Sequence, residues 1–345
     1  MALPYPYGLS AYKFYQKGRD MDKKFKTYNQ QMKYLRDSKN IICNGSNNKT
    51  ILIRTGYFNL INGYKTPFVQ SIDSQGKHIY YGGTTIEHFY AVKNFDDEIR
   101  HILLKYLTKV EEEMRTVIGY EFDKFNENAK INWYEVQAYS PDAQATDIIK
   151  SISNCYSDIS INQSNYVRHY LDNHHIIPTW VLMKVISFSH FINFINICKQ
   201  PVVETVCDIY GILDDKGAPS KDLLISMLHL FRKIRNSCAH NERIYEMQRK
   251  NGRVNAPFRT FLSNSKPYTN TRSQTIVDCF VCLRYFLDDC DYSAMINLLK
   301  KEYLNLQEKI NSNVFSKVRA STGVKQVELF DELLSIKKCI EYNRL

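Results

Sequence analysis

An apolar stripe at helical spacing, between Thr84 and Val117, constrains the fold more than any other feature of the sequence. Its members recur every three or four residues for about nine turns, which indicates one long amphipathic helix. Thr84 and Thr85, followed by Glu87 and His88, are typical of the N-cap of such a helix. The stripe consists of Phe89, Val92, Phe95, Ile99, Ile102, Tyr106, Val110, Met114 and Val117.

The rest of the chain also favours helices over strands. Its 345 residues include 13 Gly and 9 Pro, too few for a turn-dense β architecture. Only residues 66–83 have the turn residues and the alternation of a small β-hairpin. We expect an all-α fold, mainly a helical bundle, with a small N-terminal α/β appendage. Further helices are expected at 163–173, 178–198, 201–210, 220–240, 272–312 and 326–344, and loops at 40–50, 211–219 and 251–268.

The positive charge is concentrated in two regions. The chain has a formal net charge of +10, and residues 1–65 contain twelve basic and three acidic side chains. A second basic segment, 232–259, contains eight basic side chains and two glutamates. This distribution predicts a polyanionic partner, either nucleic acid or an acidic membrane surface. With the helical pattern it suggests three parts: a basic N-terminal region (1–83), a helical domain (84–260) and a C-terminal helical extension (261–345).

Residues 22–38 predict a basic amphipathic helix. Phe25, Tyr28, Met32 and Leu35 share one face, which leaves the lysines on the others. This lysine face is either a solvated surface or a nucleic-acid contact. The lysines concerned are Lys23, Lys24, Lys26 and Lys33.

The cysteines and apolar segments indicate a cytoplasmic protein without a metal or membrane anchor. Nine cysteines follow no framework pattern, and the first residues lack the order of a signal peptide. Cys279 and Cys282 lie in an apolar helical pattern, so buried thiols are favoured over a zinc site, and no cofactor is expected. The segment 176–198 is apolar but contains Pro178 and Lys184, which favours a buried helix over a transmembrane span.

Arg235, Asn236 and His240 form the pattern most suggestive of chemistry. On a regular helix Asn236 and His240 are about 40° apart, and Arg235 and His240 about 140° apart. The long Arg235 side chain is able to reach the same cleft. An imidazole exchanges protons near neutral pH and a guanidinium grips phosphate, which suits RNA cleavage by the neighbouring 2′-hydroxyl. The alternative is structural: Arg235 pairs with a carboxylate and His240 caps its helix.

The segment around these residues resembles the catalytic motif of HEPN-domain ribonucleases, in which an Arg and a His are separated by four to six residues. The wider sequence resembles the Abi family of abortive-infection proteins, of the AbiD/AbiF type, over roughly residues 20–250. The blocks that carry this resemblance, in order, are Arg54–Tyr64 with Pro67 and Phe68, Gly83–Glu87, Phe95–Arg100, Glu111–Thr116, Pro178–Trp180 and the motif itself.

The resemblance implies a HEPN-like fold and a metal-independent endoribonuclease that acts in phage defence. Arg235 and His240 are then the catalytic pair and Asn236 their polar partner. HEPN nucleases combine two motifs, so a homodimer is implied, and AbiF-type proteins are associated with a structured noncoding RNA. The family often has a second His where this chain has Asn241. Basic residues expected to contact RNA are Lys23, Lys24, Lys26, Lys33, Arg54, Arg232, Lys233 and Arg243.

Two other functional classes remain open at this stage. One is a noncatalytic RNA-binding scaffold in a defence or toxin–antitoxin ribonucleoprotein, and the other is a membrane-attached effector that uses 176–198 as an anchor. The aromatic cluster of Tyr57, Phe58 and Tyr64 is expected in the core, although such rings also stack on bases. The carboxylates in 95–100 and 111–113 are expected on a solvated face or paired with arginines, and His174–His175 lack a third metal ligand.

Overall fold

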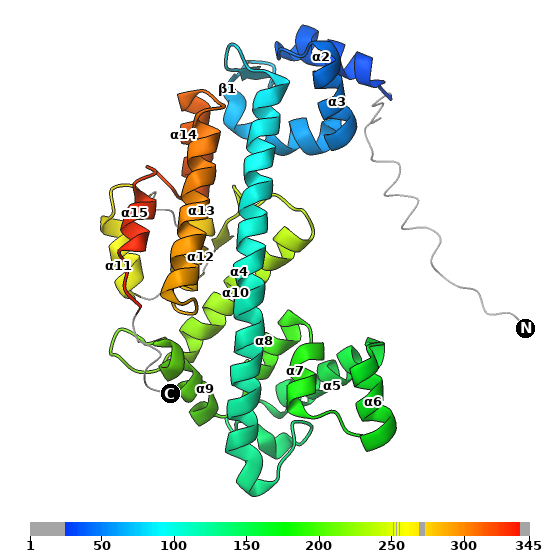
Figure 1. The fold of residues 1–345 in the computed structure, drawn as a ribbon, viewed down its shortest axis with the longest axis vertical. Coiled ribbons are helices and arrows are strands. Elements are labelled where there is room, and N and C mark those ends of the chain that lie inside the picture. The colour runs from blue at the N-terminus through cyan, green and yellow to red at the C-terminus, as the bar shows by residue number, and fades with distance from the viewer. Residues whose placement is uncertain (1–24, 251, 253, 255, 269–272, 339–345) are drawn as a thin grey trace, which may run out of the picture.

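The computed structural model describes residues 25–338, apart from 251, 253, 255 and 269–272. Its spine is α4 (Ile86–Asn126), a helix of 41 residues and about 60 Å that runs the length of the molecule (Figure 1). Thr85 and His88 form the predicted capping box at its start. The expected stripe is confirmed, and the helix continues nine residues beyond Val117.

The elements between residues 28 and 80 pack around the first turns of α4 (Figure 1). The expected hairpin is confirmed, with an antiparallel pairing and a bulge between Val69 and Ser71. The expected loop at 40–50 is wrong, because a helix starts at Gly45, buries Leu52 and places Asn48 in a hydrogen bond with Glu87 of α4. The elements are α2 (Tyr28–Lys39), α3 (Gly45–Thr55), the π-helix η1 (Phe58–Asn62), the 3₁₀ turn η2 (Thr66–Phe68), β1 (Val69–Ile72) and β2 (His78–Tyr80).

A second group of helices surrounds the far end of α4 (Figure 1). Gly119 of α4 lets α7 approach closely, since a Cβ there would lie 2.9 Å from Cγ of Met183. The elements are η3 (Glu127–Ala129), η4 (Val136–Ala138), α5 (Ala145–Ile161), α6 (Asn165–His174), α7 (Thr179–Val185), α8 (Phe188–Ile197) and α9 (Gln200–Tyr210).

The expected single helix at 178–198 is wrong, because the chain breaks at Ile186 and Ser187. The Ser187 side chain caps α8, and its backbone N–H donates to Asp158 at 2.8 Å. The backbone N–H groups of Ser187 and His190, which would donate to the preceding turn in a continuous helix, thus have side-chain acceptors at the break. Across the described part of the chain, no helix combines the length and the apolar character needed to cross a membrane.

The remaining helices cross or flank α4 (Figure 1). α10 crosses it diagonally and α13 packs along its first half. The expected helix at 272–312 is interrupted, because Asp288 caps a new helix. A short helix also stands in the expected loop at 251–268. The elements are α10 (Lys221–Ala239), β3 (Arg249–Lys250), α11 (Ala256–Asn264), β4 (Ser273–Gln274), α12 (Ile276–Leu283), α13 (Asp289–Gln307), α14 (Ser312–Thr322) and α15 (Leu329–Leu334).

One hydrophobic core connects residues from all three predicted parts. Met32, Ile118 and Phe330 belong to the same buried cluster. The mainly helical fold with a small hairpin appendage is therefore confirmed, while the three-part division stays a prediction. Cys279 and Cys282 are buried as expected, and burial raises the pKa of each thiol well above its usual value.

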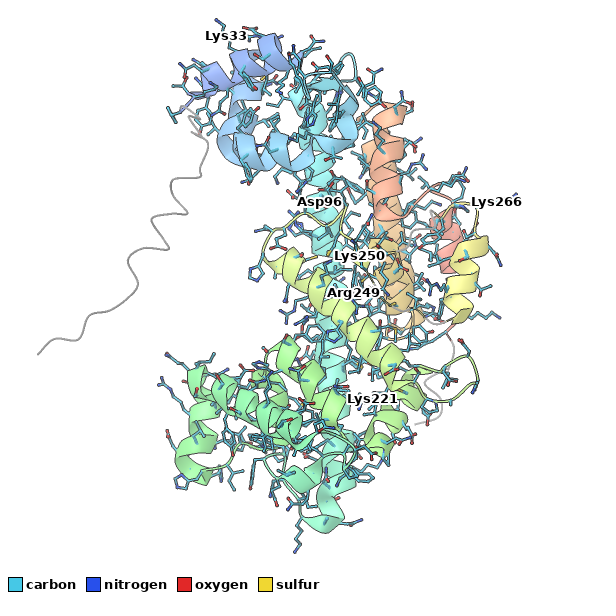
Figure 2. The ribbon with its side chains drawn as sticks, turned by 180° about the vertical axis from the view of Figure 1, so that it is seen from behind. Lys33, Asp96, Lys221, Arg249, Lys250 and Lys266 are labelled. Carbon is cyan, nitrogen blue, oxygen red and sulfur yellow. The ribbon has the colours of Figure 1, made fainter. Side chains whose placement is uncertain are left out.

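Asp96, in the first third of α4, is the most completely buried carboxylate of this core (Figure 2). Its Oδ2 accepts from the Tyr64 hydroxyl at 2.9 Å and from Arg100 at 2.8 Å. Its Oδ1 accepts from the backbone N–H groups of Ile244 and Tyr245 at 3.2 and 2.8 Å. One side chain thus joins the chain before α4, at Tyr64, to α4 itself and to the segment after α10.

We expect Asp96→Asn to lower the free energy of unfolding by about 3 kcal/mol, because the buried Arg100 loses the more deeply buried of its two carboxylate partners, Asp96 and Asp97. The measurement is urea denaturation. Glu98→Gln, on the same helix but exposed, is the control and is expected to change stability by no more than about 0.5 kcal/mol. Equal stabilities for the two variants would contradict the central role of Asp96.

Candidate active site

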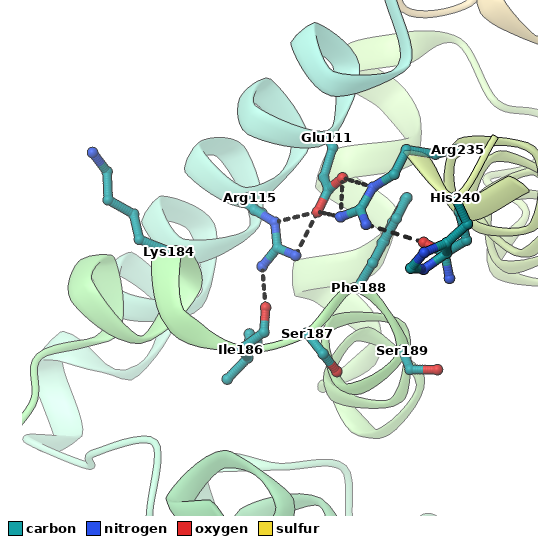
Figure 3. A pocket seen from close by; sticks show the side chains of 10 residues that line it. Glu111, Arg115, Lys184, Ile186, Ser187, Phe188, Ser189, Arg235 and His240 are labelled. Atoms are coloured by element: carbon teal, nitrogen blue, oxygen red, sulfur yellow. Dashed lines mark hydrogen bonds and ion pairs between the residues drawn. The ribbon is translucent and has the colours of Figure 1, made fainter. Parts of the chain in front are cut away.

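A pocket of about 440 Å³ lies where the end of α10 meets α4 and the break between α7 and α8 (Figure 3). Three cationic side chains line it, those of Arg115, Lys184 and Arg235, against the carboxylate of Glu111. Its other lining residues are Ile186, Ser187, Phe188, Ser189, Asn236 and His240. The excess of positive charge suits an anionic ligand.

Glu111 holds the two arginines of this pocket on one buried carboxylate (Figure 3). Arg235 donates through Nε to Oε2 at 2.8 Å and through Nη2 to both oxygens at 2.8 and 2.7 Å. Arg115 donates to Oε1 through Nε at 3.1 Å and Nη2 at 2.7 Å. Such charge-assisted, bidentate contacts fix the planes of both guanidinium groups.

Arg115 also closes the back of the pocket. Its Nη1 donates to the carbonyls of Met183 at 2.6 Å and Ile186 at 2.9 Å, at the end of α7. Burial lowers the pKa of this guanidinium, and the Glu111 carboxylate opposes that shift. The Phe188 ring packs against Arg235, with 5.5 Å between the guanidinium carbon and the ring centroid. The break between α7 and α8 thus places an acceptor for Arg115, at Ile186, and a packing partner for Arg235, at Phe188.

Asn236 and His240 complete the predicted triad at the open side of the pocket. Arg235 Nη1 donates to Oδ1 of Asn236 at 3.0 Å. The second N–H of Nη1 has no acceptor within the described ranges of the chain. His240 is the exposed C-cap residue of α10. The structural alternative is thus correct in that Arg235 pairs with a carboxylate, and His240 stands at the helix end.

The end of α10 positions the His240 imidazole. The N–H groups of Asn241 and Glu242 donate to the carbonyls of Cys238 at 3.3 Å and Ser237 at 2.9 Å. This is the pattern of a Schellman motif, whose residue after the C-cap takes a left-handed conformation. Asn241 has φ 55°, a region that asparagine tolerates better than most residues. Asn241 therefore favours the end of α10 directly after His240.

The residues predicted to contact RNA are divided between the site and the region around α2. Arg54, Lys233 and Arg243 line a second cavity that also includes His240, and Arg232 donates to Ser189 of the smaller pocket. Lys33 lies on α2, at the end of the molecule where α4 begins (Figure 2), and Lys26 directly precedes that helix. Lys23 and Lys24 lie outside the described residues.

Sequence reasoning proposed Arg235, Asn236 and His240 as site residues but assigned no site role to Glu111 or Arg115. Of the two alternatives for the carboxylates in 111–113, a solvated face or arginine partners, the second is confirmed for Glu111, which pairs with two arginines. The four-residue spacing of Glu111 and Arg115 was the available signal. The aromatic cluster is core at Tyr64, whereas Phe58 is 74% exposed, so the core prediction is wrong for that ring. Among the described residues, no three His, Cys, Asp or Glu side chains gather as a metal site would require.

We expect Glu111→Gln to lower the free energy of unfolding by about 2 to 4 kcal/mol, because two neighbouring guanidinium groups lose their shared counter-charge. Glu112→Gln, on the exposed face one residue later, is the matched control and is expected to have little effect. Thermal and urea unfolding measure both variants. A Glu111→Gln protein as stable as the control would show that this ion pair is dispensable.

Comparison with known proteins gives one match. Residues 50–246 match the model of the family described as Abi-like protein, and this range is more than half of the chain. No curated protein and no solved structure matched. The matched range contains every residue that lines the smaller pocket. The chain therefore belongs to the Abi-like protein family.

Proposed function

We propose that this Abi-like protein is a metal-independent endoribonuclease of the HEPN type that acts in abortive-infection defence. Family membership supports the defence role. The observation that carries the nuclease proposal is the fixed Arg235 guanidinium beside the exposed His240 imidazole in a cationic pocket. The resemblance of residues 235–240 to the HEPN motif supports the same assignment.

The proposed reaction needs no external nucleophile. The 2′-oxygen of a ribonucleotide loses its proton and attacks the adjacent phosphorus, and the bond from phosphorus to the 5′-oxygen breaks. The leaving oxygen takes up a proton, which gives a 2′,3′-cyclic phosphate and a 5′-hydroxyl. Imidazoles transfer both protons, and Arg235 stabilises the charge that develops on the phosphate oxygens.

A homodimer provides the second imidazole in this proposal. Among the described residues, His240 is the only histidine that lines the smaller pocket, whereas the reaction uses one base and one acid. Its exposure at the end of α10 leaves it accessible to a second copy of the chain. The imidazole of one copy then acts as base and that of the other as acid.

The second candidate is a noncatalytic RNA-binding scaffold. It is favoured by the ion pair of Arg235 with Glu111, because a guanidinium whose charge is already balanced stabilises less of the charge that develops during cleavage. In this case the motif grips RNA without cleaving it. Cleavage of RNA by the purified protein separates the two candidates, because a scaffold yields no products.

We expect the purified protein to cleave single-stranded RNA in excess EDTA and to leave 2′,3′-cyclic phosphate ends, while DNA resists. His240→Ala should lower the cleavage rate by about 10²- to 10⁴-fold, the range for loss of a general acid or base. His174→Ala, an exposed histidine on α6, is the control. Strict dependence on magnesium, or full activity in His240→Ala, would contradict the proposal.

The N-terminal lysines are proposed to hold a structured noncoding RNA rather than the scissile strand. Lys26 and Lys33 are exposed and lie at or before α2, away from the pocket. Replacing both by Gln should weaken binding of the co-purified RNA and reduce the slope of log K against log [salt] by about 1 for each phosphate that is no longer neutralised. The cleavage rate of a short substrate should not change. An unchanged salt slope would refute this assignment.

A further inference from the structure

A groove of about 1020 Å³ runs beside the smaller pocket, and His240 lines both. One wall consists of the end of α3 and the π-helix η1, from Arg54 to Tyr64. The other consists of α10 and the segment that follows it, up to Gln248, and α4 contributes the residues between them. A chain-like ligand with one phosphate at His240 can therefore extend along the groove and contact both of its walls.

The charges of the groove suit a polyanion. Five arginine and lysine side chains line it, against three carboxylates. Lys93 pairs with Asp97 at 2.5 Å, and Arg243 pairs with Glu246. Arg54 and Lys233 have no carboxylate partner within the part of the chain that the structure describes. Lys233 donates to the backbone carbonyl of Gln248 at 2.6 Å, which positions its ammonium without neutralising it.

Phe58 is the unusual member of this wall. Its side chain is 74% exposed, although the neighbouring Leu60 and Ile61 are buried and anchor η1 to the core. Asn59 and Asn62 expose their amides on the same turn. A rigid turn that presents an aromatic face, amides and nearby cations has the groups with which proteins bind an unpaired nucleotide.

We propose that this groove binds unpaired ribonucleotides next to the scissile phosphate and that Phe58 stacks on one of their bases. The inference rests on the proposed nuclease function and specifies its substrate as single-stranded RNA. Arg54 and Lys233 contact backbone phosphates. A base within a duplex has both faces covered by its neighbours, so Phe58 gives no stacking energy there. The wall that bears Phe58 is thus a positioning element for the strand.

The test uses the full-length protein and a short 2′-O-methyl oligonucleotide, which lacks the attacking hydroxyl and is not cleaved. 2-Aminopurine placed at each position in turn reports stacking by loss of fluorescence. We expect quenching at one position with the wild-type protein and its loss in Phe58→Leu, with affinity about 5- to 150-fold lower. Phe58→Trp, which keeps an aromatic ring, should retain both the quenching and the affinity. Tyr120→Leu, which removes an exposed ring on α4 outside the groove, should change neither.

The same probe annealed to its complement should bind at least tenfold more weakly than the single strand. Equal binding of strand and duplex, or quenching that is the same in wild type, Phe58→Leu and Phe58→Trp, would overturn the proposal. The uncleavable probe separates this result from the nuclease proposal. Phe58-dependent binding without cleavage of ordinary RNA would refute only the nuclease, whereas cleavage with unaltered binding in Phe58→Leu would refute only the groove.

Discussion

The buried carboxylate of Asp96 joins three parts of the chain that are distant in sequence. It receives the Tyr64 hydroxyl from the chain before α4, Arg100 from its own helix, and two backbone N–H groups from the segment after α10. A buried carboxylate without hydrogen-bond donors would strongly destabilise the fold. Moving any of these donors away from Asp96 therefore costs free energy. The position of the chain after His240 therefore depends on the interior of the molecule.

Glu111 repeats this arrangement about 22 Å further along α4. It fixes Arg235 from one side, while Arg115 links the same carboxylate to the carbonyls at the end of α7. The two catalytic candidates are thus positioned differently. Arg235 is preorganised by a buried ion pair, whereas His240 stands exposed at the end of its helix. A fixed cation and an accessible imidazole fit a division between charge stabilisation and proton transfer.

Local signals in the sequence predicted the elements that depend on local interactions. The stripe and N-cap of α4, the hairpin and α10 follow from periodicity and capping, which involve near neighbours. The errors arise where distant contacts decide. α3 has few apolar residues and is stabilised against α4, and the break at Ile186–Ser187 is held by Arg115 and Asp158. The exposure of Phe58 was equally hidden, because the sequence does not show which ring of a cluster remains outside the core.

The bounds of the family match enclose the two cavities and leave out the C-terminal helices. The match starts within α3 and ends at Glu246, so it contains nearly all of both walls of the groove and all of the smaller pocket. The helices beyond it, α13 above all, pack along the first half of α4 and bury its apolar face there. Since α4 carries both Asp96 and Glu111, these C-terminal helices support the site without lining either cavity. If the proposed nuclease function is correct, substrate contacts are expected in the matched region, while the later helices bury the apolar face of α4.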